Sequence, residues 1–540
     1  MRRITLLWSL CISLLLACTC RGQAKTSPAT PPAEPRPFAI EVVDEATGRG
    51  VPLVELKTTA NVRYFTDSAG LAAIDDPVLM GGEAFFYVSS HGYEFPADGF
   101  GFHGVRLKVT PGGTARVKIK RVNIAERLYR ITGEGIYRDS VRLGRPTPID
   151  HALLDAQVTG QDSSLAAVYH GKIHWFFGDT FRPAYPLGHF WTAGAVSNLP
   201  GDAGGLDPAV GVNLEYYADA DGFSRGTVPR TDSHPAWLDG LTVLPGDDGA
   251  ERLVAKCSVM EGLGKCLARR LMVFNDDRGM FDSLKEIPLD VPLYPVGHPF
   301  RAESEGTKWI YFGQCWPNIR VKDDWKSLQD FSDYETFTCF TPGSRFQKNH
   351  PPFDRDADGK LVWAWKKDTG SFEKGTMFEL LSSGKLKPEE IWFLPTDVET
   401  REPAYLGMGS VAYNAFRQKW VMIGEEIGGK SSFMGEIYYA EADRPEGPWP
   451  WARKIVTHNR YSFYNPLQQP FFEQGGGRMI YFQGTYAATF SGNDDPTPRY
   501  DYNQMMYRLD LSDPRLRLPE EAPPKAKGRS GSLSRLGPAH

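Results

Sequence analysis

The stretch "GQDSSLAAVYHGKIHWFFGDT", residues 160–180, is the clearest indication of the fold of this 540-residue chain. Apolar residues alternate with polar ones on both sides of His170 and Gly171, which predicts two antiparallel strands joined by a turn. Asp162 opens the first of these strands, and Asp179 follows the second. The question is whether this is an isolated hairpin or one part of a repeating sheet.

Four later stretches repeat a polar or acidic opening, an apolar strand, a turn and an aromatic-rich second strand. The five units begin at Gln161, Trp237, Gly297, Gly409 and Asn465. Five such units predict a five-bladed β-propeller over residues 130–512, in an all-β chain. The stretch "RYDYNQMMYRLDL", residues 499–511, is predicted to close the ring. Two stacked sandwiches are the alternative, with even strand lengths and no repeated opening.

The first unit resembles the first blade of five-bladed propeller glycosidases: the arabinanase and xylosidase group, the invertase and levanase group, and the mannoside phosphorylases. In that resemblance Asp162 is the catalytic base or nucleophile, although Ser163 stands where those families commonly have proline. "FFGDT" resembles a divergent branch with an FGDT signature, some members of which cleave arabinan. "GEIYYAEADRPEGPW", residues 435–449, is similar to a strand and turn that these glycosidases share as a scaffold feature.

Glycoside hydrolysis needs one protonated and one ionised carboxyl group across the scissile bond. Asp162 is the predicted general base. Asp179 is predicted to tune a partner or to bind a sugar hydroxyl. Asp239, which opens the second unit, is predicted to modulate the pKa of the acid. Each of the three is also a residue type that forms ordinary turns.

The general acid is harder to identify, because several glutamates lie near blade edges. Glu303 is the prediction, with Glu402 and Glu425 or Glu426 as alternatives. Aromatic rings pack on the C–H faces of sugars, and polar side chains bind the hydroxyls. The predicted substrate-binding residues are His298, Arg301, Trp191, Trp237, Trp316, Asn465, Gln468 and Tyr486. The aromatic members would otherwise fill the space between blades.

The segment "DRDADG", residues 354–359, has the acidic spacing of a calcium loop. Asp354, Asp356 and Asp358 would supply oxygen ligands to a structural calcium ion. The twelfth position of such a loop needs a glutamate, whereas this chain has Trp365. A solvated acidic turn is therefore the second interpretation. Catalysis by two carboxyl groups requires no cofactor.

The N-terminal part predicts export and a second domain. Residues 1–24 have the layout of a signal peptide, and the residues ending at Cys18 resemble a bacterial lipobox. Residues 25–37 form a proline-rich linker, and residues 38–122 predict a β-sandwich. On "DEATG", "TDSAGLAAI" and "SSHGYEF" this sandwich resembles carboxypeptidase-regulatory-like, transthyretin-type modules, which act as spacers. Residues 513–540 predict a disordered tail.

A net charge of −5 gives no basic surface for nucleic acid. The chain is therefore predicted to be a monomeric, secreted or lipid-anchored surface protein that binds carbohydrate and hydrolyses it. The alternative is a non-catalytic carbohydrate-binding or adhesion propeller. Export favours disulfides, and Cys257 and Cys266 are close enough in sequence to join across a hairpin. Four cysteines allow three pairings, and free buried thiols are the other interpretation.

Overall fold

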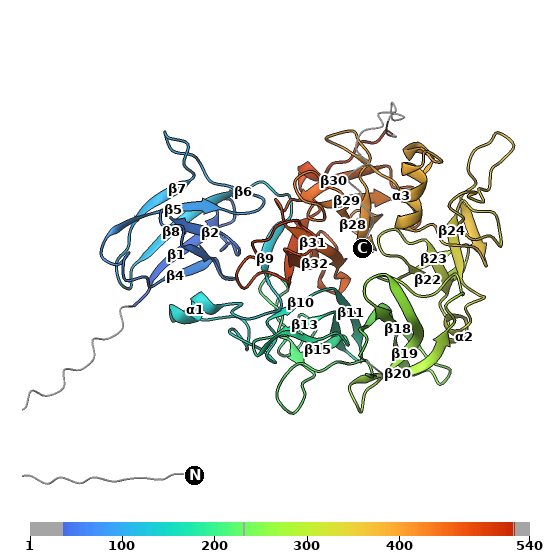
Figure 1. Ribbon diagram of the computed structural model, residues 1–540, viewed down its shortest axis with the longest axis horizontal. Helices are drawn as coiled ribbons and strands as arrows, with labels where there is room; N and C mark the ends of the chain where they lie inside the picture. The colour runs from blue at the N-terminus through green and yellow to red at the C-terminus, as the bar shows by residue number, and fades with distance from the viewer. Residues whose placement is uncertain (1–35, 231–232, 522, 524–540) are drawn as a thin grey trace, which may run out of the picture.

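The computed structural model describes residues 36–230, 233–521 and 523. It is an all-β protein with a two-sheet sandwich followed by a five-bladed propeller, which confirms the predicted fold class (Figure 1). The predicted signal peptide, Cys18 and nearly all of the linker lie outside the described residues. Among the described residues, no helix is long and apolar enough to cross a membrane.

Each blade is one antiparallel sheet that begins with an inner strand. Blade one consists of β11 (Ser164–Tyr169), β12 (Lys172–Phe177), β15 (Ala193–Asn198) and β16 (Glu215–Tyr216). Blade two consists of β17 (Ala236–Pro245), β18 (Glu251–Glu261), β19 (Lys265–Asn275) and β20 (Met280–Ile287). Blade three is β21 (Phe300–Ser304), β22 (Thr307–Phe312), β23 (Ile319–Lys322), β24 (Glu335–Thr338), β25 (Ala364–Lys367). Blade four is β27 (Leu406–Asn414), β28 (Lys419–Glu426), β29 (Ile437–Ala442), β30 (Trp451–Val456), with β26 (Thr396–Asp397) parallel to β30.

The ring is closed by a strand that comes before the propeller in the sequence. Blade five is β31 (Ser462–Gln468), β32 (Met479–Ala487), β33 (Asn503–Asp510) and β9 (Glu126–Arg130). The prediction that residues 499–511 close the ring is wrong, because β33 is the third strand and β9 pairs with its outer edge. Hydrogen bonds between β9 and β33 thereby join the two ends of the propeller.

The remaining elements decorate this frame. A small sheet beside blade one is β10 (Gly160–Gln161), β13 (Thr180–Arg182), β14 (Tyr185–His189). The helices are α1 (Arg138–Arg142), α2 (Trp325–Gln329), α3 (Lys374–Ser382), η1 (Pro388–Glu390), η2 (Pro470–Phe472) and η3 (Pro514–Leu516). Leu516 of η3 is buried against blade five, so the start of the predicted disordered tail is ordered.

The sandwich stacks two four-stranded sheets. One is β4 (Leu71–Ile74), β1 (Phe38–Asp44), β8 (Thr114–Arg121), β6 (Tyr93–Glu94), and the other is β3 (Arg63–Phe65), β2 (Glu55–Thr58), β5 (Glu83–Ser89), β7 (Gly104–Lys108). Alternating apolar side chains such as Leu56 and Phe86 fill the space between the sheets.

Buried polar contacts fix the sandwich against blade five. The guanidinium group of Arg127, on β9, is 1% exposed and donates to the carbonyl oxygens of Pro52 at 2.9 Å and His91 at 3.1 Å. Tyr500 donates its hydroxyl to the Thr66 carbonyl at 2.6 Å and accepts from the Leu53 amide at 3.1 Å. The two domains therefore share a continuous interior.

We expect Arg127→Ala to lower the free energy of unfolding by about 3 kcal/mol, because buried carbonyl groups lose their donor. Urea unfolding followed by tryptophan fluorescence measures this loss. The control is Arg116→Ala, which removes an exposed ion pair with Glu41 on the sandwich surface. A loss no larger than that of the control would mean that the interface contributes little.

The four cysteines beyond the signal peptide are free. Strand register places Cys257 opposite Arg270 and Cys266 opposite Met260, so the two thiols do not face each other across the β18–β19 hairpin. The interpretation as free thiols therefore holds in this structure.

Candidate active site

All five inner strands line one cavity of about 350 Å³, as expected for the axial channel of a propeller. Its lining comes from residues 165–168, 241–243, 298–301, 410–412 and 467–471. Of the five openings, Gln161 and Gly297 come before the inner strand, Trp237 is at its start, and Gly409 and Asn465 are within it. Side chains from different blades contact one another there, and these contacts define the candidate site.

Asp162 lies two residues before β11 and is held by donors from two blades. Its Oδ1 accepts the backbone N–H of Asp179 at 2.8 Å, and its Oδ2 accepts the Tyr464 hydroxyl at 3.1 Å. Burial raises the pKa of Asp162, and hydrogen bonds from Asp179, Tyr502 and Tyr464 oppose that rise. These donors favour the ionised carboxylate. A Cβ at Gly178 would lie 2.2 Å from Oδ1, so only glycine leaves room for this carboxylate.

Asp179 follows β12 and turns its side chain toward blade two, where Trp237 Nε1 donates to its Oδ1 at 2.8 Å. Burial, and then the charge of Asp162, raise the pKa of Asp179 to about 7. Two neighbouring carboxyl groups do not readily ionise together. Because Asp162 has more donors, it carries the negative charge while Asp179 keeps the proton up to about neutral pH.

Asn465 joins blades one, four and five at the same end. Its backbone N–H donates to Glu425 Oε2 at 3.1 Å, and its side-chain amide donates to the Ser163 hydroxyl. Ser163 and Asn465 both have left-handed backbone conformations, with φ of 38° and 53°. Such conformations cost energy in residues other than glycine and occur often at functional sites.

Glu425 is the penultimate residue of β28 and is 0% exposed. Burial raises the pKa of its carboxyl group to about 8, against the opposing charge of Lys374. The group is therefore neutral at pH 7, but it has no surface with which to contact a substrate. It positions Asn465. The neighbouring Glu426 faces Lys454 instead, and burial raises its pKa to about 7.

We expect Glu425→Gln to change the pH dependence of stability. The unfolded glutamate ionises near pH 4.5 while the folded one stays protonated to about 8, so the unfolded state binds fewer protons between these values and stability falls as pH rises. The variant lacks this loss, so its free energy of unfolding relative to wild type rises by more than about 1 kcal/mol from pH 5 to pH 8. Urea titrations at several pH values measure it. A pH-independent difference would mean that folded Glu425 ionises normally.

Asp239 ties blade two to blade three. Its Oδ1 accepts the backbone N–H groups of Gly297 at 2.6 Å and Gly240 at 3.0 Å, and Lys256 lies 3.2 Å from its Oδ2. Burial lowers the pKa of the nearby His298 to about 4, against the opposing charge of Asp239, so His298 is neutral at pH 7. The carboxylate of Asp239 thus orders the opening of blade three.

Glu303, the predicted general acid, is not brought to this end of the propeller. It is exposed and lies opposite Lys308, one residue before the β21–β22 turn. At about 3.3 Å per residue, the strand carries it roughly 15 Å beyond His298. Glu402, an alternative, is also exposed, near Lys430. The sequence pattern located the strand but not the end of it that reaches the site.

The predicted substrate-binding residues divide into two groups. Trp316 is buried and stacks on Phe393 with 5.4 Å between ring centroids. Tyr486 is buried and hydrogen-bonded to His91 at 2.9 Å, at the domain interface. Gln468 is buried and donates to backbone carbonyls of blade four. Trp316 and Tyr486 are structural residues, which corrects their predicted role, whereas Gln468 also lines the axial channel.

The others lie at or beside the site. Trp237 contacts Asp179. Trp191 is half-buried next to Thr192, whose hydroxyl forms hydrogen bonds with the backbone of Ala236 and Leu238 at the start of β17. The Arg230 guanidinium covers the Trp191 ring at 4.4 Å. His298 and Arg301 line the channel, where Arg301 pairs with Asp323 at 2.9 Å.

The three acidic residues of the predicted calcium loop do not converge. Asp354 pairs with the ammonium group of Lys366 at 2.7 Å, and Asp356 accepts the backbone N–H groups of Asp358 and Lys360. In the part of the chain that the structure describes, no cluster of three or more His, Cys, Asp or Glu residues is arranged to hold a metal ion. The acidic-turn interpretation therefore fits these contacts.

We expect an excess of EDTA to change the Tm by less than about 1 °C, because Lys366 already neutralises Asp354. Differential scanning fluorimetry with and without EDTA measures this, and added Ca²⁺ is the control. A clear fall in Tm that Ca²⁺ reverses would contradict it.

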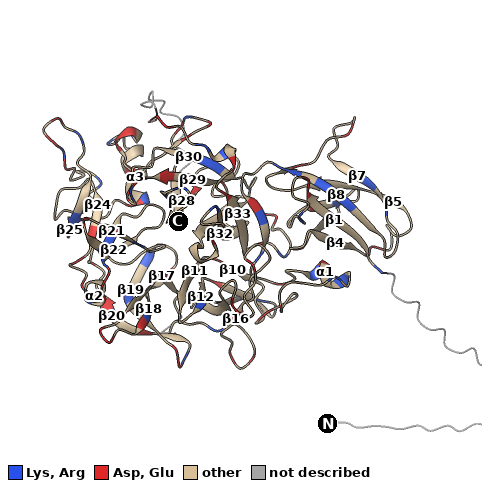
Figure 2. Cartoon of the chain, turned by 180° about the vertical axis from the view of Figure 1, so that it is seen from behind, with Lys and Arg blue, Asp and Glu red and all other residues tan. Residues whose placement is uncertain are grey.

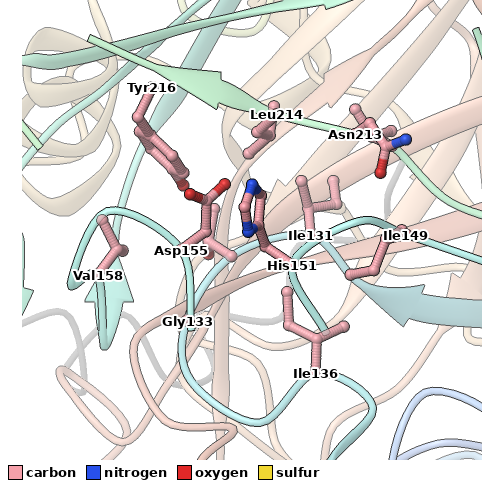
Figure 3. Close-up of a pocket in the computed structure, with 12 residues that line it drawn as sticks. Ile131, Gly133, Ile136, Ile149, His151, Asp155, Val158, Asn213, Leu214 and Tyr216 are labelled. Carbon is pink, nitrogen blue, oxygen red and sulfur yellow. The ribbon is translucent and has the colours of Figure 1, made fainter. Parts of the chain in front are cut away.

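A second cavity of about 20 Å³ lies beside blade one (Figure 3). Burial raises the pKa of Asp155 there, against the opposing charge of His151. The Tyr216 hydroxyl, which lies beside Asp155 in this cavity, donates to Gln161 at 2.8 Å. The volume holds about one water molecule, which excludes a sugar ring.

No family model matches the chain, and no curated protein does. Among solved structures, an exo-β-1,3-galactanase from Phanerochaete chrysosporium with β-1,3-galactotriose is 8% identical, with 72% of this chain and 65% of that chain covered, at a TM-score of 0.35. The GH43_1 enzyme from Xanthomonas citri with xylotriose is 12% identical, with 65% of this chain and 86% of that chain covered, at a TM-score of 0.30. The α-L-arabinanase from Penicillium chrysogenum with arabinobiose is 12% identical, with 72% of this chain and 99% of that chain covered, at a TM-score of 0.31. Similarities of this size do not assign this chain to a family.

Proposed function

We propose that the propeller is a glycoside hydrolase that cleaves an oligosaccharide or polysaccharide at the Asp162 end of its axis. The observation that supports this most is the carboxyl pair of blade one. Asp162 accepts several hydrogen bonds that favour its anion, whereas Asp179 keeps its proton to about pH 7. One charged and one protonated carboxyl group are what glycoside hydrolysis requires.

In this mechanism Asp179 protonates the glycosidic oxygen as the bond from that oxygen to the anomeric carbon breaks. Asp162 acts on the anomeric carbon, either by taking a proton from the attacking water or by forming the bond itself. The water supplies the new hydroxyl group, and its remaining proton returns to the carboxyl pair. Trp237 holds the Asp179 side chain and offers aromatic surface to sugar rings.

A second candidate function is binding without catalysis. It is favoured by the opening of blade three, where Gly297 and the neutral His298 stand and the predicted acid Glu303 does not. A propeller of this kind would hold a glycan at the same aromatic residues.

A glycan panel separates the two functions. The full chain is incubated with arabinan, xylan, β-1,3-galactan and their oligosaccharides, and new reducing ends are measured. We expect release from at least one substrate. Binding to a glycan with no release from any substrate would favour the second candidate.

Export and lipid anchoring are also proposed, from residues outside the described part of the chain. The charged and apolar N-terminus and the lipobox-like residues ending at Cys18 support them. Incorporation of labelled fatty acid, and its loss in Cys18→Ser, tests the anchor.

A further inference from the structure

One sheet of the sandwich exposes a row of aromatic rings to solvent. On β5, Ala84, Phe86 and Val88 point into the core, so Phe85 and Tyr87 point outward. Their rings meet edge to face at 5.1 Å, and Phe102 meets Tyr87 in the same way at 6.0 Å. Phe102 is 49% exposed and Phe100 is 89% exposed. We call Phe85, Tyr87 and Phe102, together with Phe100 of the turn that carries Phe102, the aromatic platform.

The backbone holds this platform in place. Asp98 Oδ1 accepts the N–H groups of Phe100 at 2.9 Å and Phe102 at 3.0 Å, which fixes the turn that carries both rings. On β7, Gly104 lies opposite Tyr87, and a Cβ there would come 2.5 Å from the Phe85 ring. The bare backbone of Gly104 therefore lets that ring lie against the sheet. Contiguous patches of exposed apolar side chains mark interaction sites.

The same face carries cations without carboxylate partners. Lys57 lies opposite Tyr87, Arg106 opposite Phe85, and Lys108 at the next outward position of β7. Figure 2 shows Lys and Arg on β7. Within the described ranges, none of the three pairs with a carboxylate, and the Lys57 ammonium lies 5.5 Å from the Tyr87 ring centroid.

The two carboxylates on this face do not neutralise its positive charge. Glu55 is already paired with Arg63 at 3.0 Å, and Glu83 stands at the edge of the face, opposite Lys108. The strand positions on this face thus carry a net positive charge around an aromatic row. The complementary partner has flat C–H surfaces and negative charge.

We propose that this face binds an acidic polysaccharide, a chain of sugar rings that bear carboxylate or sulfate groups. The rings of the polymer pack on the aromatic platform, and its anions pair with Lys57, Arg106 and Lys108. The proposal does not depend on hydrolysis by the propeller. It assigns a binding function to a module otherwise expected to be a spacer.

Affinity electrophoresis of the full chain tests this. Asp162→Asn is the background, so that the polymer is not degraded, and polygalacturonate or neutral dextran is cast in the gel. We expect polygalacturonate to retard the protein more than dextran does, and less at high salt. Phe100→Ala with Phe102→Ala should raise the Kd about tenfold, a change of about 1.4 kcal/mol. Lys57→Ala with Arg106→Ala should weaken binding similarly.

Val78→Ala is the matched control, because Val78 is an equally exposed apolar side chain of the sandwich outside the platform. Tm values verify that each variant is folded. The proposal is overturned if polygalacturonate does not retard the protein, if dextran binds equally, or if the Phe100 and Phe102 variant binds like Val78→Ala. It is also overturned if Trp237→Ala, at the propeller site, abolishes the retardation. None of these outcomes bears on the glycan panel.

Discussion

Asp162→Asn is expected to lower kcat by about 10³-fold, because the variant keeps the shape of the side chain but loses the negative charge that acts at the anomeric carbon. The asparagine oxygen can still accept the Asp179 backbone N–H, and the asparagine NH2 group can donate to the Tyr464 hydroxyl oxygen in place of the bond that Oδ2 accepts. The Tm should therefore change by less than about 3 °C. Reducing-end release from the best substrate of the panel, with thermal unfolding in parallel, measures both effects.

Asp354→Asn is the matched control for this variant. It makes the same chemical change in a carboxylate that is paired with Lys366, away from the inner-strand openings. We expect it to keep kcat within about twofold of wild type. Equal activity of Asp162→Asn and Asp354→Asn would show that Asp162 takes no part in the chemistry.

Asp179→Asn is expected to lower kcat on natural glycosides by about 10²-fold, because the leaving oxygen loses its proton donor. A dinitrophenyl glycoside leaves without protonation, so its hydrolysis should fall much less. Trp237 Nε1 can still donate to the asparagine oxygen, and the side chain should keep its position.

The pH dependence of the hydrolysis rate is a second test of the role of Asp179. Since the pKa of Asp179 is raised to about 7, the wild-type rate should fall as pH rises through that value, because the donor loses its proton. On the acidic side of the profile, the rate should rise with pH as Asp162 ionises, and the pKa of Asp162 is also raised. Asp179→Asn should lack the fall near pH 7. An unchanged fall in the variant would assign it to another group.

The repeated openings of the five units made the propeller predictable. Each opening lies before or within an inner strand in the structure, because alternation of apolar side chains reports directly on strands that pack between neighbouring blades. Asp162 could be predicted for the same reason, since it stands at the start of the first such strand. The closing strand β9 was missed because it lies between the predicted sandwich and the predicted propeller.

Side-chain direction could not be predicted from spacing alone. Trp316 and Tyr486 are residue types that are common at sugar-binding surfaces, but their side chains are buried in the interior. Glu303 belongs to the correct strand and lies at its far end. The raised pKa of Asp179 depends on Asp162 lying against it and on its burial, neither of which a strand pattern reports.

A crystal structure of Asp162→Asn with an uncleaved oligosaccharide of the best substrate tests the proposed site most directly. We predict that the glycosidic oxygen lies within hydrogen-bond distance of the Asp179 carboxyl group, with the anomeric carbon facing residue 162 and a sugar ring against Trp237. An oligosaccharide seated elsewhere on the propeller, with no contact to Asp179, would contradict hydrolysis by this carboxyl pair.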